Sequence, residues 1–234
     1  IEKLVYVDMN DEHRKYYEEK RKYYYSLLEN NTSSQGTFDK FFVLQAINEL
    51  RHIVSSPELD NNKIISSKKE VLIENVIEAI ENDHKVLIFV NYLSSIESIC
   101  NSLKENKIKF LKMTGQTKDR QSLVDKFQSD NRYKVFVMTL KTGGVGLNLV
   151  SADTIFIYDP WWNTTVENQA IDRAYRLGQD KTVFAYKMIM RNTIEEKILK
   201  LQEIKDKLLD DLISEDNLST KNLSKNDIEF ILGN

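Results

Sequence analysis

Cysteine and histidine are scarce in this sequence. Cys100 is the only cysteine, and the three histidines, His13, His52 and His84, are scattered along the chain. A single cysteine cannot form a disulfide within the chain, and the histidines do not have the spacing of metal ligands. The scarcity fits a reducing, intracellular compartment. No apolar run approaches the roughly 18–20 residues that a membrane-spanning helix needs. These absences exclude a disulfide framework and a thiolate metal cluster, and we expect no membrane partner.

Two further absences concern the start of the chain and its phosphate-binding motifs. The first residue is Ile1, with no initiator methionine and no basic-then-apolar leader, so we expect a piece of a longer protein. No GxxxxGKS or GxxxxGKT loop occurs, and no buried strand ends in an acidic box. In P-loop enzymes these two motifs hold the triphosphate of a nucleotide and its Mg²⁺.

The net charge of −3 at first argues against a nucleic-acid-binding protein. The charge is uneven, however, because residues 203–234 hold eight acids and four lysines. That segment alone carries −4, which leaves about +1 on the remainder. The overall charge therefore neither excludes a local basic groove nor argues for one.

The middle of the chain alternates between short apolar runs and amphipathic segments. With 234 residues, 41% hydrophobic and 29% charged, it can bury one good core. Runs that are apolar throughout predict strands buried on both faces, and the segments between them predict helical crossovers. Because such crossovers join parallel strands, we expect a parallel α/β sheet. The predicted strands are residues 85–90, 108–113, 134–139, 154–159 and 183–190.

Helical segments flank this sheet domain on both sides. Residues 1–65 begin with a short apolar alternation and then predict two helices, the first capped by Asn10 or Asp8. Tyrosines at helical spacing in the first helix indicate a packing stripe or, alternatively, a surface on which bases stack. We expect the sheet domain to occupy residues 66–192. Residues 193–234 predict a long amphipathic helix, which we call the brace helix, and a tail with one short helix. The brace helix is expected to pack on the sheet domain or on the N-terminal helices.

The segment QAIDRAYRLGQ, residues 169–179, has the pattern Q-x-x-x-R-x-x-R. If Thr164 or Thr165 caps a helix that Gly178 ends, the spacing places Arg173 and Arg176 on one helical face, with Gln169 one turn earlier. Two fixed guanidinium groups suit the charge that spreads over a transferring γ-phosphoryl group. The alternative is a pair of solvated surface arginines.

The segment TLKTGGVGLNL, residues 139–149, contains three glycines after a predicted strand. Glycines let backbone N–H groups approach an anion without interference from Cβ atoms. The alternative is a tight turn at the end of a strand.

Two tryptophans, Trp161 and Trp162, directly precede Asn163. Both cannot point inward from an extended chain, so one of them is exposed or lies in a groove. Asn91, Thr114 and Arg120 follow other strands at their carboxyl ends, where α/β domains carry ligand sites.

Together these segments resemble the last conserved blocks of the Swi/Snf-type family of superfamily-two ATP-dependent DNA translocases. The resemblance extends from the Leu50-Arg51-x-Ile53 helix to the brace helix. It implies a parallel-sheet RecA-like (P-loop NTPase-like) domain, the second of two ATPase lobes. It also implies arginine fingers at Arg173 and Arg176, supported by Gln169. The same resemblance assigns Gly146 and Asn148 to the nucleotide, and assigns to DNA the residues Thr139, Lys141, Thr114, Arg120, Asn91 and Trp162. For Trp162, packing against the other lobe is the alternative.

The implied partners are double-stranded DNA, the N-terminal ATPase lobe of the same protein and a DNA-bound protein complex. ATP and Mg²⁺ are the implied cofactors, bound mainly by the other lobe, so we expect this chain to be inactive alone. The implied location is the bacterial cytoplasm near the nucleoid, or the nucleus of a eukaryote. Two other interpretations remain: a strand-separating DNA or RNA helicase, and a non-catalytic interaction module with the same fold. The sequence Arg-Leu-Gly-Gln argues against an RNA helicase, which usually carries arginine at the position of Gln179.

Overall fold

The computed structural model describes residues 1–31, 38–143, 146–160, 164–204 and 224–233. Its contacts group into two compact units. The first comprises Ile1–Val7 and Lys68–Ile189, and the second comprises Asp8–Ser67 and Met190–Asn234.

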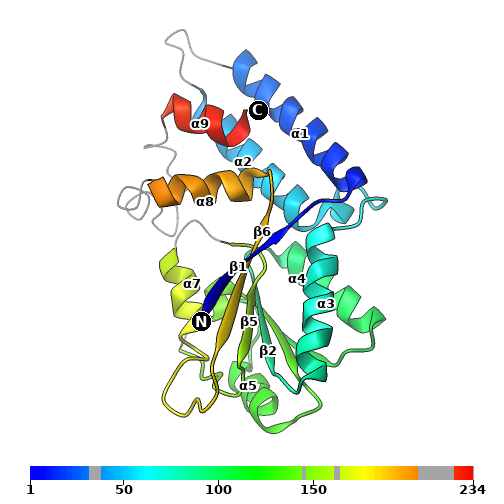
Figure 1. Ribbon diagram of the computed structural model, residues 1–234, viewed down its shortest axis with the longest axis vertical. Coiled ribbons are helices and arrows are strands. Elements are labelled where there is room, and N and C mark those ends of the chain that lie inside the picture. Colours follow the sequence, from blue (N-terminus) through cyan, green and yellow to red (C-terminus); the bar gives the residue numbers. More distant parts are fainter. Residues whose placement is uncertain (32–37, 144–145, 161–163, 205–223, 234) are drawn as a thin grey trace. The chain divides into compact units, whose positions relative to one another are not determined.

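The first unit is built on a six-stranded sheet in the order β1-β6-β5-β2-β4-β3 (Figure 1). Pairings of β2 with β4 and β5, of β3 with β4 and of β5 with β6 are all parallel. β1 lies beside β6 at one edge of the sheet. The Ile1 N–H donates to the Val183 carbonyl (2.8 Å) and the Ala185 N–H donates to the Ile1 carbonyl (2.9 Å), which is the hydrogen-bond pattern of parallel strands. The strands are β1 (Glu2–Val7), β2 (Val86–Val90), β3 (Phe110–Met113), β4 (Val135–Thr139), β5 (Thr154–Ile157) and β6 (Phe184–Met190).

Helices cover both faces of this sheet. They are α3 (Ser67–Glu81), α4 (Leu93–Glu105), α5 (Arg120–Ser129), the single turn α6 (Leu140–Gly143) and α7 (Thr164–Ile171). α3 and α7 lie on opposite sides of the strands in Figure 1. Every residue of β2 is buried, as expected of a central strand covered twice. One face packs Leu87 and Phe89 into a core with α5 and α7.

The second unit consists of helices. It contains α1 (Asp11–Asn30), α2 (Lys40–Ser55), a short 3₁₀ turn (Pro57–Leu59), α8 (Ile194–Ile204) and α9 (Lys225–Leu232). The buried His13 ring lies 2.8 Å from the carbonyl oxygen of Ile53, which ties α1 to α2. The buried Tyr17 hydroxyl accepts a hydrogen bond (2.8 Å) from the Ile194 N–H at the start of α8. Burial raises the pKa of Tyr17 well above its ordinary value, so this hydroxyl stays neutral.

The predicted parallel α/β sheet and its flanking helices are confirmed, and one detail of the sheet differs. β1 belongs to the sheet, a place that its short apolar alternation did not indicate. Asn10 caps α1, accepting a hydrogen bond from the His13 N–H as predicted. The brace helix is described as far as Ile204 and contacts the N-terminal helices; its predicted continuation lies outside the described residues. Among the described helices, none combines the length and apolarity required to cross a membrane.

Candidate functional site

The segment after β4 begins with one helical turn, α6. Thr139 ends the strand, and its hydroxyl lies 2.7 Å from the hydroxyl of Thr142 and accepts a hydrogen bond from the Thr142 N–H (3.3 Å). The Thr139 side chain therefore caps the turn. Lys141 lies within the turn and is exposed, with no side-chain hydrogen bond or ion pair to another described residue. Residues 144 and 145 lie outside the described residues.

The end of the glycine segment alternates between solvent and core. Gly146 and Asn148 are exposed, whereas Leu147 and Leu149 are buried in the core on the α5 and α7 side. Gly146 has φ +54°, a conformation that favours glycine, although a Cβ atom there would meet open space. Buried leucines thus hold the segment down while its two predicted nucleotide-binding residues face outward.

The arginines do not lie on a helix as predicted. α7 ends at Ile171, and residues 172–178 continue as a series of turns. Some backbone hydrogen bonds here span fewer residues than in an α-helix. The Arg173 N–H donates to the Ala170 carbonyl (3.2 Å), and the Arg176 N–H donates to the Ala174 carbonyl (3.2 Å). We call residues 172–178 the arginine turn. Buried Ala174 separates a partly exposed Arg173 from a fully exposed Arg176, and Gln169 is exposed on α7. The expectation of a shared helical face is therefore wrong.

The arginine turn is hydrogen-bonded to the end of the glycine segment. The Leu149 N–H donates to the Arg173 carbonyl at 3.0 Å, so Asn148 and Arg173 are brought together. The Gln179 side-chain amide donates to the carbonyls of Val150 (2.9 Å), Ala152 (2.7 Å) and Ala174 (3.3 Å). Gln179 is the principal residue whose role was missed, because its contacts are to backbone carbonyls distant in the sequence. Its only signal was its place at the end of the arginine motif.

The remaining predicted residues lie where other strands end. Asn91 follows β2, and its side-chain amide donates to the Asp159 carbonyl at 2.5 Å while its backbone N–H donates to the Asp159 carboxylate at 3.2 Å. Thr114 follows β3 and accepts from Gln116 N–H at 3.3 Å. Arg120 begins α5 and donates back to the Gly115 carbonyl at 3.2 Å. Since the strands are parallel, all these residues lie at the carboxyl edge of the sheet. Trp162 lies outside the described residues.

The predicted residues form two groups at this edge. Asn148 and Arg173 belong to the hydrogen-bonded pair of segments, and Asn91 is joined to the end of β5. Within the described ranges, no hydrogen bond links Thr114 or Arg120 to the glycine segment. The exposed cations Lys141 and Arg176 have no side-chain partner among those residues. An edge with exposed, unpaired cations and outward-facing backbone can bind phosphate groups.

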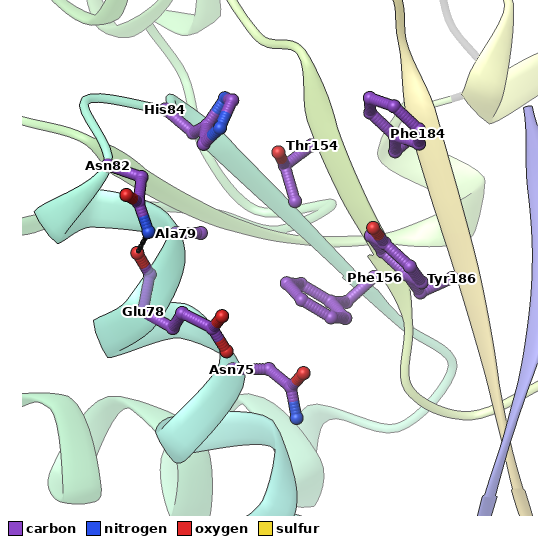
Figure 2. Close-up of a pocket in the computed structure, with 9 residues that line it drawn as sticks. All are labelled: Asn75, Glu78, Ala79, Asn82, His84, Thr154, Phe156, Phe184 and Tyr186. Carbon is purple, nitrogen blue, oxygen red and sulfur yellow. Dashed lines mark hydrogen bonds between the residues drawn. The ribbon is translucent and has the colours of Figure 1, made fainter.

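The amino edge of the same sheet carries a different feature, a pocket of about 200 Å³ between α3 and the strands (Figure 2). Asn75, Glu78 and Asn82 line it from α3. Across from them the ring of Tyr186 stacks on Phe156 with centroids 5.3 Å apart. The pocket lies near the amino ends of β5 and β6, whereas the predicted residues lie at the carboxyl ends of the strands. It is therefore not part of the candidate site.

In the part of the chain that the structure describes, no group of three or more His, Cys, Asp or Glu side chains is arranged to hold a metal ion. The predicted site residues at the carboxyl edge carry amides, hydroxyls, backbone N–H groups and cations, beside the buried Asp159 carboxylate that bonds to Asn91. Their N–H and O–H donors suit phosphate oxygens.

Comparison with known proteins supports the fold. The model of the helicase conserved C-terminal domain matches residues 67–178. The fold matches the C-terminal domain of the Sulfolobus solfataricus SWI2/SNF2 ATPase with a TM-score of 0.78 and 27% identity, over 99% of this chain and 97% of that domain. This chain belongs to the SWI2/SNF2 family of helicase-like ATPases. It has the fold of the family's C-terminal RecA-like lobe.

Proteins from other organisms are also similar over most of the chain. An ATP-dependent helicase of Mycoplasma pneumoniae is 36% identical over 215 residues, which are 91% of this chain and 20% of that protein. The DNA repair protein RAD5 of Mycosarcoma maydis is 40% identical over 164 residues, 67% of this chain and 12% of that protein. The Sulfolobus solfataricus core in complex with double-stranded DNA matches with a TM-score of 0.82 at 28% identity, over 99% of this chain and 49% of that one. This chain thus spans about a fifth of the Mycoplasma relative.

Proposed function

We propose that this lobe is the second half of an ATP-driven translocase on double-stranded DNA, and that it is inactive without the first. It supplies arginine fingers to a nucleotide held on the first lobe, and it supplies half of a DNA-binding groove. The observation that carries the proposal is the bond between the two segments at the carboxyl edge, Leu149 N–H to the Arg173 carbonyl. Through it, the segment expected to contact DNA and nucleotide is joined to the turn that carries the arginines.

Arg173 and Arg176 stabilise the charge that develops on the γ-phosphoryl group during hydrolysis. Arg176 is exposed and has no side-chain partner among the described residues, so its guanidinium group is available to a phosphate from outside the lobe. Gln169 is exposed one turn before Arg173, where its amide can orient a guanidinium or a water. Outward-facing Gly146 and Asn148 contact the ribose side of the nucleotide.

ATP and Mg²⁺ are expected to rest mainly on the first lobe, whose phosphate loop and acidic box this chain lacks. When bound, Mg²⁺ would neutralise part of the negative charge on the phosphates. The residues of this lobe hold the guanidinium groups in position. When this lobe closes on the first lobe, water is excluded from the reacting phosphate.

DNA contact is assigned to the strand ends on the same edge. Thr139 and Lys141 lie on the turn after β4, and Asn91, Thr114 and Arg120 follow β2 and β3. Hydroxyls, amides and cations of this kind bind phosphate oxygens and position a protein on DNA without reading its sequence. Because phosphate contacts release counterions, the isolated lobe should bind DNA weakly and lose that affinity as salt rises. Trp162 is assigned to DNA as well, on its family motif alone.

The decisive test changes Arg173 and Arg176 together to alanine in the full-length protein. DNA-stimulated ATP hydrolysis should fall by about a thousandfold or more, whereas ATP binding, measured by equilibrium dialysis, should stay within about threefold of wild type. Lys200→Ala, on α8, is the control for loss of a surface cation. Unchanged turnover in the double variant would favour a non-catalytic interaction module.

Two further measurements complete the test. The isolated 234-residue chain should hydrolyse no ATP above background, and measurable turnover would contradict the division of labour proposed here. A strand-displacement assay on the full-length protein separates a translocase from a strand-separating helicase. We expect displacement of a triplex-forming strand from duplex DNA without separation of the duplex itself.

A further inference from the structure

Gln179 stands out among the polar side chains at the carboxyl edge because its single amide contacts three separate backbone carbonyls. Two of them, Val150 and Ala152, lie between the glycine segment and β5. The third, Ala174, lies between the two arginines. The amide therefore joins the exit of the glycine segment to the middle of the arginine turn.

The orientation of this amide is fixed from its other side. The Gln179 Oε1 accepts a hydrogen bond from the Lys181 N–H at 2.9 Å. A carbonyl oxygen must therefore face Lys181, which leaves the NH₂ group facing the three carbonyls. An NH₂ group has two hydrogens, so the 2.7 and 2.9 Å contacts use one each and the 3.3 Å contact to Ala174 is shared.

The neighbouring backbone adds one bond within the arginine turn and one between the two segments. The Gln179 N–H donates to the Arg176 carbonyl at 3.0 Å, which closes the arginine turn just before the side chain begins. The Leu149 N–H donates to the Arg173 carbonyl at 3.0 Å. Gln179 is partly buried, so solvent competes only weakly for these bonds.

We propose that Gln179 is a positioning residue that makes the glycine segment and the arginine turn move as one body. A shift of the glycine segment on DNA contact is then passed to Arg173 and Arg176. This inference rests on the proposed function, because it concerns how DNA contact sets the placement of the arginines. Gln179 itself touches neither nucleotide nor DNA.

The expected kinetic signature separates positioning from binding. Misplacement of a catalytic group by a fraction of an ångström to 1 Å lowers turnover far more than it lowers affinity. Loss of the Gln179 amide should therefore lower the DNA-stimulated kcat and leave the KM for ATP and the Kd for DNA nearly unchanged.

The test uses the full-length protein with two variants, Gln179→Ala and Gln179→Glu. The first removes the amide, and the second keeps its size but replaces the NH₂ donors with an oxygen that faces three carbonyls. We expect the DNA-stimulated kcat to fall by about tenfold in both, with KM and Kd within twofold of wild type. The matched control is Gln121→Ala on α5, which should behave as wild type. Among the described residues its amide donates to the exposed Asp125 alone, at 2.8 Å.

Hydrogen exchange on the same full-length protein gives a readout independent of activity. The Leu149 and Gln179 amides should exchange about tenfold faster in both variants, while amides of the central strand β2 should be unchanged. Wild-type kcat in both variants, or a parallel fall in kcat and DNA affinity, would overturn the proposal. So would loss of the folded state, because Gln179 would then serve stability. A wild-type protein without DNA-stimulated hydrolysis would refute the proposed function, and the exchange experiment would still decide whether the two segments are joined by Gln179.

Discussion

At the amino edge of the sheet several charged side chains are paired with one another, whereas two cations at the carboxyl edge are exposed and unpaired among the described residues. Buried Asp153, just before β5, accepts a hydrogen bond from the Lys181 ammonium group (2.9 Å), and the His84 Nδ1 lies 3.1 Å from its other carboxylate oxygen. At the carboxyl edge, Lys141 and Arg176 are exposed and have no side-chain partner among the described residues. The contacts between charged groups at the amino edge contribute stability, whereas Lys141 and Arg176 at the carboxyl edge are available to bind a ligand.

Other cations at the amino edge follow the same rule. The Lys134 ammonium group contacts the Asp83 carboxylate at 2.7 Å, and buried Lys85 donates to the Phe127 carbonyl at 2.6 Å. Burial lowers the pKa of Lys85 from its ordinary value. The comparison therefore predicts that substitutions at the amino edge change the free energy of unfolding, while substitutions at the carboxyl edge change activity.

The largest expected effect comes from Arg176→Ala in the full-length protein. DNA-stimulated ATP hydrolysis should fall by about a thousandfold, with no measurable change in the thermal midpoint, because Arg176 is exposed and makes no described side-chain contact. Lys134→Ala, which removes a cation from the other edge, is the matched control and should retain turnover. Equal losses of turnover in the two variants would contradict the prediction that only the carboxyl edge affects activity.

The next effect is on stability. Asp153→Ala removes a buried carboxylate that contacts Lys181 and His84, so the free energy of unfolding should fall by about 2 kcal/mol. The partners remain partly exposed and can be solvated, which keeps the loss below that of a fully buried pair. Urea unfolding of the 234-residue chain measures it. Asp83→Ala, whose carboxylate is 90% exposed, should change the unfolding free energy by less than about 0.5 kcal/mol.

Lys141→Ala should weaken binding to double-stranded DNA by about fivefold and lower the slope of log affinity against log salt by about one. The reason is the loss of one phosphate contact at the exposed turn after β4. Fluorescence anisotropy at several salt concentrations gives both quantities. Lys104→Ala, an exposed lysine near the end of α4, should leave the slope unchanged. An unaltered slope in Lys141→Ala would remove this residue from the DNA interface.

The smallest effect concerns pH at the amino edge. Hydrogen bonds from the Arg132 side chain and backbone hold the pKa of Asp130 at about 2, below its ordinary 3.8. A depressed pKa contributes stability that is present above about pH 4 and is lost as pH falls through about 2. Urea midpoints of wild type and Arg132→Ala should therefore differ most above pH 4 and converge toward pH 2. A difference that stays constant over this range would contradict the assignment.

The strands were predictable because their residues are apolar throughout. The run KVLIFV at 85–90 has no polar residue after its first, and the structure places β2 at Val86–Val90 with every residue buried. β1 was not assigned to the sheet because its outer residues are exposed and its pairing with β6 joins segments about 180 positions apart. Local periodicity carries no information on such a pairing.

The candidate site was predictable in its residue types and less so in its conformation. Helical spacing correctly predicts a helix that contains Gln169, but α7 ends at Ile171 because Ala174 and the bonds to Leu149 and Gln179 draw the chain into turns. These are tertiary contacts, and they override local helix propensity. The same contacts explain why the role of Gln179 could not be predicted from its motif.

The alternation at the end of the glycine segment also restricts how the protein can vary in length. Gly146 and Asn148 face solvent only because Leu147 and Leu149 occupy the core. Inserting or deleting one residue between positions 146 and 149 would invert this pattern, burying an amide and exposing a leucine. Natural variants of this segment should therefore differ by substitution and keep its length, whereas the exposed loop before β4 can tolerate insertions.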